Sequence, residues 1–258
     1  MKIYNIKKIM VINMEHQFSR IELLLGQDNM DMLKEKKVAI FGIGGVGGYV
    51  VEALARSGIG KFVLIDSDKV SLSNINRQII ATTKTYDKYK CDVMEERIHD
   101  INPNALVETH KCFFLPSNAE DFNFTSYDYV VDAVDTVTAK IAIIEKAKQN
   151  NIPIISAMGA GNKINPLMLR VEDISKTKVD PLAKVMRLEL KKRRIKNVKV
   201  VYSLENPIKA KENIEESDGS RKRTIPGSTA FVPSTMGLVI ASEIIKDLTG
   251  IKNEALGA

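Results

Sequence analysis

Short apolar runs alternate with longer amphipathic segments along the first 160 residues of the chain. The apolar runs have the composition of buried parallel strands, and they lie at 38–41, 61–65, 106–110, 127–133 and 152–156. Between them, helical composition is found at 49–57, 90–100 and 139–149. This alternation predicts an α/β fold: a doubly wound, mostly parallel, Rossmann-like sheet with helices on both faces.

The second half of the chain has a different pattern. A basic helix is predicted at 182–194, a strand at 198–202 and a polar, charged loop at 207–224. An apolar-patterned helix is predicted at 236–248, ended by Gly250, and Leu238, Val239, Ile245 and Leu248 are its expected packing residues. We interpret residues 14–258 as one domain with a C-terminal α+β extension, and residues 1–13 as an N-terminal extension.

Composition excludes several classes of protein. Hydrophobic residues make up 44% of the 258 residues and charged residues 27%, as in an ordinary globular domain. No apolar run approaches the roughly 18 residues of a membrane span. The two cysteines, Cys91 and Cys112, exclude a disulfide scaffold and a four-cysteine zinc site, and they favour reduced thiols in the cytoplasm. The net charge of +6 is compatible with a polyanionic partner.

A glycine-rich turn, VAIFGIGGVGG at 38–48, is the first chemical signal. Gly42, Gly44 and Gly47 fit the pattern G-x-G-x-x-G, with Gly45 inside it, directly after a predicted strand and before a predicted helix. Glycines permit a tight turn and a close approach of phosphates, and the N–H groups of the following helix favour an anion. Asp66 ends the next strand, where an acceptor for ribose hydroxyls belongs. The combination predicts a nucleotide site, although either feature alone could be a plain turn or a solvated carboxylate.

A polar cluster follows the second predicted strand, in the segment DSDKVSLSNINRQ at 66–78. A plain NAD-binding domain does not need it. Arg77 offers a planar fork of donors for phosphate oxygens, Asn74 can bind a phosphate or ribose, and Lys90 adds a point charge at a helix start. Asp135 ends the strand YDYVVDAVD, where a carboxylate could hold Mg²⁺. Each residue alone could be an ordinary exposed side chain, but all of them are predicted near the carboxyl ends of strands, where open α/β sheets bind ligands.

The motifs GIGGVG, DSDKVSLSNINRQ and VDAVD, in this order, resemble those of the ATP-dependent adenylating superfamily of ubiquitin-activating enzymes and their bacterial relatives. The resemblance implies ATP and Mg²⁺ as cofactors. It implies that the glycine loop, including Gly44, binds phosphate, that Asp66 binds the ribose with Asp68 nearby, and that Asp135 binds the metal. The residues that it implies at the phosphates are Asn74, Arg77 and Lys90.

The segment QFSRIELLLG, residues 17–26, also resembles the N-terminal motif of this superfamily. The resemblance implies a homodimer in which Arg20 reaches the ATP of the opposite subunit, so that Arg20, Arg77, Lys90 and Asp135 carry catalysis. One position departs from the family pattern. The family has a glycine three residues before its phosphate lysine, whereas this chain has Asp87, and Lys88 is a second candidate beside Lys90.

The small number of cysteines narrows the choice among the branches of the superfamily. Branches that activate proteins commonly carry paired C-x-x-C zinc motifs and a cysteine after the adenylation site, but this chain has no cysteine after Cys112. The late segment RKRTIPGSTAFVPSTMGL resembles instead the branch that adenylates and cyclises threonylcarbamoyladenosine in tRNA, a reaction that needs no enzyme cysteine. The alternatives are adenylation of the C-terminal glycine of a sulfur-carrier protein, an NAD-dependent oxidoreductase and a catalytically silent RNA-binding module. Docking of a sulfur-transfer partner stays open.

Two basic clusters are candidates for contacts with tRNA phosphates. Six of the nine residues at 191–199 are basic, with no acid among them, and Arg221, Lys222 and Arg223 form a second cluster. A solvated charged surface is the alternative interpretation of both. The three histidines show no metal-ligand spacing and are assigned no role.

Overall fold

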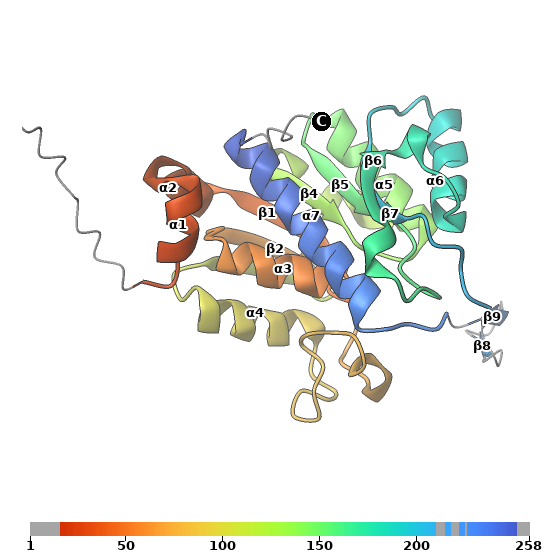
Figure 1. Cartoon of the computed structure of the whole chain (residues 1–258), viewed down its shortest axis with the longest axis horizontal. Coiled ribbons are helices and arrows are strands. Elements are labelled where there is room, and N and C mark those ends of the chain that lie inside the picture. Colours follow the sequence, from red (N-terminus) through yellow and green to blue (C-terminus); the bar gives the residue numbers. More distant parts are fainter. Residues whose placement is uncertain (1–15, 210–214, 218–221, 225, 252–258) are drawn as a thin grey trace, which may run out of the picture.

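A seven-stranded sheet forms the centre of the protein in a computed structural model, which describes residues 16–209, 215–217, 222–224 and 226–251 (Figure 1). The strand order is β3-β2-β1-β4-β5-β7-β6, and only β6 runs antiparallel to its neighbour. The fold is therefore the doubly wound, mostly parallel α/β fold predicted from the sequence. The strands are β1 (Lys37–Phe41), β2 (Lys61–Ile65), β3 (Leu106–His110), β4 (Tyr129–Asp132), β5 (Ile154–Ala157), β6 (Leu169–Asp173) and β7 (Lys199–Ser203).

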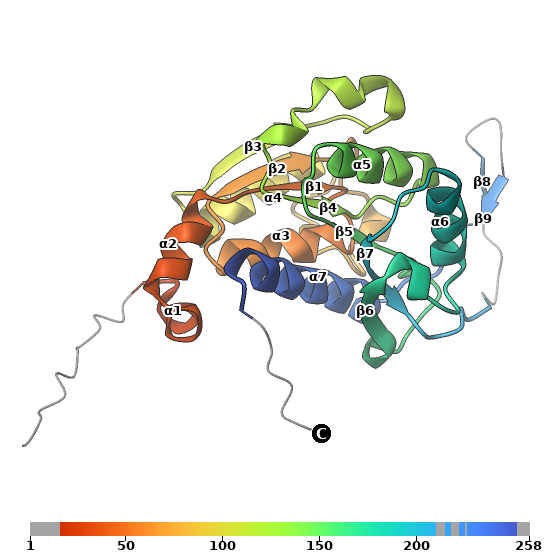
Figure 2. The ribbon, with the colours of Figure 1, turned by 90° about the horizontal axis from the view of Figure 1, so that it is seen from above.

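Helices cover both faces of this sheet (Figure 2). One face packs against α3 (Gly47–Arg56), α4 (Lys90–Ile101) and α7 (Phe231–Thr249). The opposite face packs against α5 (Val137–Gln149), α6 (Pro181–Lys192) and an aromatic group that includes Phe114, Phe122 and Phe124. The short 3₁₀ helices are η1 (Leu72–Asn74), η2 (Pro116–Asp121), η3 (Phe124–Ser126), η4 (Pro166–Met168) and η5 (Ile174–Lys176).

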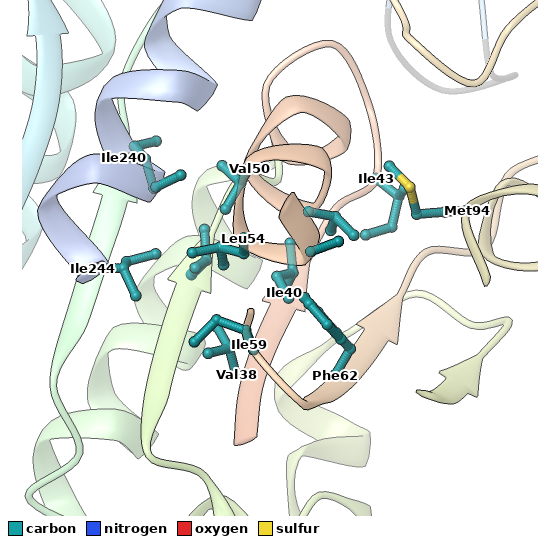
Figure 3. Close-up of a cluster of buried hydrophobic side chains, with 14 of the residues drawn as sticks. Val38, Ile40, Ile43, Val50, Leu54, Ile59, Phe62, Met94, Ile240 and Ile244 are labelled. Carbon is teal, nitrogen blue, oxygen red and sulfur yellow. The ribbon is translucent and has the colours of Figure 1, made fainter. Parts of the chain in front are cut away.

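The core is built by the alternation of side chains along the central strand. Val38 and Ile40 of β1 point to the layer of α3 and α7, where they meet Leu54 and Ile244 (Figure 3). Their neighbours Ala39 and Phe41 point to the other face. Each large aliphatic side chain buried in this way contributes about 1.5–3 kcal/mol to stability. Because β1 is buried on both faces, the crevice at its carboxyl end has a rigid floor.

Helix α7 lies directly against α3 because Gly237 allows close approach. A Cβ atom at Gly237 would lie 2.5 Å from the carbonyl oxygen of Val46, at the start of α3. The buried face of α7 is the four-residue repeat Val232, Met236, Ile240 and Ile244. Other residues of α7 were predicted to pack in the core or at a dimer interface: Val239, Ile245 and Leu248 are partly buried against the core, and Leu238 is exposed in the single chain.

The later part of the chain departs most from the sequence prediction. The strands β6 and β7 extend the main sheet, and β6 was not predicted. The predicted loop at 207–224 contains a hairpin, β8 (Glu215–Ser217) paired with β9 (Lys222–Thr224). Two N-terminal helices, α1 (Ser19–Leu25) and α2 (Gln27–Glu35), precede β1. No helix within the described ranges is long and apolar enough to cross a membrane. The predicted N-terminal extension at 1–13 lies outside these ranges.

Candidate active site

Three segments meet at the point where the sheet reverses its strand order. The glycine loop follows β1, Asp66 follows β2, and Asp135 lies just beyond β4. Because β1 pairs with both β2 and β4 in parallel, all three segments leave the sheet at one edge. This edge is the topological switch point at which doubly wound sheets bind ligands.

The glycines of the loop have two different roles. Gly42 has φ +90°, and a Cβ atom there would meet the carbonyl oxygen of Ala133 at 2.7 Å. A Cβ atom at Gly47 would lie 1.8 Å from the carbonyl oxygen of Gly42, so both positions need glycine for backbone packing. At Gly44 the nearest atom to such a Cβ is Nε2 of Gln78, at 3.8 Å. The loop therefore leaves room for a ligand at Gly44, beside the N-terminus of α3, where phosphates bind favourably.

Asp66 is held by the backbone on both sides. Its Oδ2 accepts a hydrogen bond from the N–H of Ile43 (2.7 Å), and its Oδ1 accepts one from the N–H of Asp68 (2.8 Å). Burial raises the pKa of this carboxyl, and the nearby charge of Lys90 opposes the rise. A carboxylate has about four acceptor positions, so Asp66 can still accept hydrogen bonds from ribose hydroxyls.

Lys90 begins α4, and its ammonium group lies beside the same carboxylates. Its Nζ is 2.7 Å from Oδ2 of Asp68 and 3.8 Å from Oδ1 of Asp66. The Nζ of Lys88 instead lies 3.9 Å from Oε2 of Glu96. Lys90 is therefore the lysine whose ammonium group lies at this edge of the sheet. The departure from the family pattern also has a structural reason. Asp87 has φ +63°, the left-handed conformation that glycine adopts readily and aspartate tolerates.

Asn74 and Arg77, the two residues of the 66–78 segment that are predicted to bind phosphate, make different local contacts. The carboxamide oxygen of Asn74 accepts a hydrogen bond from the N–H of Ser71 (3.1 Å), so Asn74 also fixes the local turn. The guanidinium of Arg77 donates from Nη1 to the carbonyl of Ser73 (2.8 Å) and to Oδ1 of Asn76 (3.0 Å). The carbon chain of Arg77 lies against Gly45, which keeps the side chain at the glycine loop.

Sequence reasoning missed Gln78, the neighbour of Arg77. Gln78 is buried, and its Oε1 has no hydrogen-bond partner within the described ranges. A buried polar atom without a partner costs about 1–3 kcal/mol, so such an atom beside Gly44 is a candidate ligand contact. The signal in the sequence was the position of Gln78 directly after Arg77. The residue type alone, an uncharged polar side chain, does not indicate that it is buried.

Asp135 is exposed beyond β4, and its Oδ1 accepts a hydrogen bond from the hydroxyl of Thr136 (3.2 Å). The described residues contain no group of three His, Cys, Asp or Glu side chains arranged for a metal. Asp135 alone could hold Mg²⁺ only together with further oxygen ligands, because Mg²⁺ is seldom caged by protein alone.

Arg20 does not lie in the same site as the other candidates. It is exposed on α1, and its neighbour Phe18 packs near Gly58, just after the C-terminal end of α3 (Figure 1). The glycine loop lies at the N-terminal end of α3, and a helix of 10 residues is roughly 15 Å long. Arg20 is therefore separated from the glycine loop of its own subunit by about the length of this helix.

Part of the basic cluster at 191–199 is neutralised by an acidic residue outside the cluster. Helix α6 ends at Lys192, and Arg194 has φ +58° outside the helix, so the helix predicted at 182–194 ends two residues early. Lys192 and Arg193 pair with Glu189, at 2.6 and 2.7 Å. Lys191, Arg194 and Lys196 are exposed and have no ion-pair partner in the described part of the chain. Of the second cluster, Lys222 and Arg223 belong to β9, and Arg221 lies outside the described residues.

Neither cysteine is arranged as a nucleophile. Cys91 is buried beneath the Asp66 edge of the sheet, and its Sγ lies 3.5 Å from the carbonyl oxygen of Asp66. Burial raises the pKa of the Cys91 thiol to about 12, and burial also raises the pKa of Cys112. Both thiols are therefore neutral at physiological pH.

The fold and the site define a nucleotide-binding protein of the doubly wound class. The model of the ThiF family matches residues 18–257, so the chain belongs to the ThiF family.

The relatives share most of their length with this chain. It is 43% identical to the tRNA threonylcarbamoyladenosine dehydratase of Bacillus subtilis over 242 residues, which cover 91% of this chain and 95% of the relative. Its structure is similar to that of the Escherichia coli tRNA threonylcarbamoyladenosine dehydratase in complex with AMP, with a TM-score of 0.81, 35% identity, and coverage of 91% and 94%. The ATP complex of the E. coli protein gives a TM-score of 0.81 at 34% identity, with the same coverage.

Proposed function

We propose that this protein cyclises threonylcarbamoyladenosine in tRNA, with ATP, through an adenylated carboxylate. The observation that carries the proposal is the edge of the sheet where the open glycine loop, the buried Asp66 and Lys90 lie together. This set matches the needs of ATP: a phosphate cradle, a ribose acceptor and a cation. Full-length similarity to dehydratases, and the binding of ATP and AMP by the E. coli protein, support the choice of reaction.

The reaction has two steps that balance without a covalent bond between the substrate and the enzyme. A carboxylate oxygen of the threonyl group attacks the α-phosphorus of ATP, and pyrophosphate leaves. The carbamoyl nitrogen of the same substrate then attacks the activated carbonyl carbon, loses its proton, and displaces AMP together with the carboxylate oxygen. The net change in the nucleoside is the loss of one water.

The residues of the site have separate tasks in this scheme. Asp66 accepts hydrogen bonds from the ribose, and the backbone at Gly44 and Gly45 receives the phosphates. Lys90 and Arg77 neutralise the charge that develops on the phosphates as pyrophosphate leaves. Mg²⁺ at Asp135, when bound, would add positive charge at the leaving pyrophosphate. No thiol takes part, which agrees with the buried, neutral Cys91.

We further propose a homodimer in which Arg20 completes the site of the opposite subunit. Two features support this: the remoteness of α1 from its own glycine loop, and the exposure of Leu24, 81%, on the same helix. The test is to mix an Arg20→Ala subunit with an Arg77→Ala subunit, each inactive alone. We expect partial recovery of activity, because one site of the mixed dimer has both arginines; an active monomer would contradict the dimer.

We propose that tRNA docks on the basic side chains of the 191–199 cluster that have no acidic partner in the described structure. These are Lys191, Arg194 and Lys196, near the end of α6. Each phosphate contact that is lost should lower the slope of log affinity against log salt by roughly 0.7–0.9. Since tRNA and ATP meet in the cytoplasm, we propose that the protein acts there.

The decisive experiment is mass spectrometry of nucleosides from tRNA incubated with the protein, ATP and Mg²⁺. We expect threonylcarbamoyladenosine to become lighter by one water, only with ATP, and not with an Arg77→Ala variant. ATP–pyrophosphate exchange that depends on a small ubiquitin-like protein and leaves tRNA unchanged would overturn the proposal in favour of a sulfur-carrier substrate.

A further inference from the structure

Asn162, in the loop after β5, hydrogen-bonds to residues that are distant in the sequence. Its side-chain Oδ1 accepts a hydrogen bond from the N–H of Gly227, and its own N–H donates to the carbonyl of Gly227, both at 2.7 Å. Its carbonyl accepts a third hydrogen bond, from the N–H of Ile208 (2.7 Å). The backbone at Asn162 has φ +57°, a conformation that asparagine tolerates. One residue therefore binds both residue 208 and residue 227.

The loop that carries Asn162 is itself firmly anchored. The next residue, Lys163, is buried, and its Nζ donates to the carbonyl of Gly159 (2.5 Å) and to Oδ2 of Asp180 (2.9 Å). The other oxygen of Asp180 accepts a hydrogen bond from Ala183 at the start of α6 (2.9 Å). Asn162 thus has a rigid base, which lets it fix the position of Gly227.

The segment at Gly227 continues directly to the phosphate site. The carbonyl of Ser228, which follows Gly227, accepts a hydrogen bond from Nδ2 of Asn76 (2.9 Å). The Oδ1 of Asn76 in turn accepts one from Nη1 of Arg77 (3.0 Å). A few residues later, Pro233 packs at Gly45, 3.3 Å from where a Cβ atom would be. Three sets of hydrogen bonds, together with the backbone between Gly227 and Ser228, therefore join Asn162 to the guanidinium of Arg77.

We propose that Asn162 and Asn76 are positioning residues for Arg77, with residues 226–230 as the link between them. This inference rests on the proposed function, in which Arg77 binds the triphosphate. A free arginine has several rotamers, and each hydrogen bond that selects one of them lowers the entropy that ATP binding must remove. The hydrogen-bond chain therefore presents the guanidinium at the glycine loop before ATP arrives.

A glycine substitution tests the role of the Asn162 side chain without changing the backbone conformation. Asn162→Gly keeps the left-handed φ and both backbone hydrogen bonds but removes the Oδ1 acceptor. Asn162→Asp keeps an acceptor and tolerates the same φ. Asn151 is a matched control, because it also has φ +57° but lies between α5 and β5, with only a backbone hydrogen bond from its N–H to Lys148. Asn151→Gly makes the same chemical change away from the site.

The test measures ATP affinity by calorimetry for these variants and for Arg77→Ala, and it measures kcat and KM for ATP in the cyclisation assay for the variants that keep Arg77. We expect Asn162→Gly and Asn76→Ala to weaken ATP binding and to lower kcat/KM for ATP roughly three- to tenfold, the size of one lost hydrogen bond. Asn162→Asp and Asn151→Gly should stay close to wild type. In the Arg77→Ala background, Asn162→Gly should have no further effect, because its action passes through Arg77.

Two outcomes would overturn the inference: Asn162→Gly matching Asn151→Gly, or its full effect persisting when Arg77 is absent. Failure of the proposed function has a different signature, since the wild-type protein would then leave the nucleoside unchanged. The calorimetric comparison between variants still tests the hydrogen-bond chain in that case.

Discussion

Two buried lysines in this protein pair with aspartates at the carboxyl ends of β4 and β2, yet their surroundings differ. Lys140, on α5, donates from Nζ to the carbonyl of Val134 (3.1 Å), to the carbonyl of Ala157 (2.7 Å) and to Oδ2 of Asp132 (2.9 Å). The side chains of Lys140 and Asp132 are both 0% exposed. An ammonium group has three donors, so Lys140 has none left for a ligand.

Lys90 pairs with an exposed aspartate, which it can exchange for another anion. Its side chain is 6% exposed, but Asp68, its nearest partner, is 53% exposed and can be solvated by water instead. The ammonium of Lys90 can therefore turn toward a phosphate without leaving a buried charge unpaired. Burial alone therefore does not distinguish the two lysines, whereas the exposure of the partner aspartate does. Lys140 instead ties β4, β5 and α5 together beneath the loop that leads to Asp135.

The largest expected effect is on stability, from Lys140→Met. The substitution leaves Asp132 buried without its cation, which should lower the free energy of unfolding by about 3–5 kcal/mol. Urea denaturation followed by circular dichroism measures this. Removing both charges, in Asp132→Asn with Lys140→Met, should recover much of the loss. A single variant within 1 kcal/mol of wild type, on the order of a surface pair, would show that the pair is not structural.

Lys90→Ala should have the next largest effect, on chemistry and not on stability. Loss of a cation at the developing phosphate charge lowers kcat by about 10²–10³-fold in comparable sites. The measurement is the rate of cyclised nucleoside formation at saturating ATP, with Lys88→Ala as the neighbouring control. If Lys88→Ala reduced the rate and Lys90→Ala did not, the assignment of the phosphate lysine would pass to Lys88.

Asp68→Asn tests the exchangeable partner directly. Because Asp68 is half exposed, its loss should change the free energy of unfolding by less than about 1 kcal/mol. The matched substitution Asp132→Asn, at the sealed pair, should cost several times more. Equal losses in the two variants, by the same urea titration, would remove the distinction between the two lysines.

The smallest effect is expected from the cysteines. Burial raises the pKa of Cys91 from 9.0 to about 12, so at pH 8 roughly one thiol in ten thousand is ionised, and alkylation should be very slow in the folded protein. The double variant Cys91→Ser with Cys112→Ser should retain cyclisation. If this folded variant consumed ATP but released no cyclised product, the mechanism would instead include a covalent thioester between a cysteine and the substrate.

The parallel strands β1, β2, β4 and β5 could be predicted because they are buried on both faces. Such strands are continuous apolar runs, and β1 and β2 carry no charged residue except the lysine at the start of each. The glycine loop and Asp66 were predictable for a related reason. Their conformation depends on the residues next to them, where a strand ends and a helix or loop begins.

The edge strand β6 could not be predicted in the same way. Its sequence, LRVED, has three charged residues in five, which is typical of a loop. It is a strand because β7 offers a free edge with which it pairs antiparallel, and its outer side does not need to be apolar. The hairpin of β8 and β9 inside the predicted loop at 207–224 is a similar case, since short strands leave little signal in composition.

By itself, the sequence determined the order of the elements, the phosphate loop and the family to which the motifs belong, because these depend on local periodicity and on single conformational requirements. Only the tertiary structure decided which charged and polar groups have partners. Lys140 lies among carbonyls of two other segments, Arg193 pairs with Glu145 of α5, and Asn162 bonds to Gly227 across 65 positions. The physical reason is that a polar side chain takes its energy from the groups that surround it in space, and long-range folding brings those groups together.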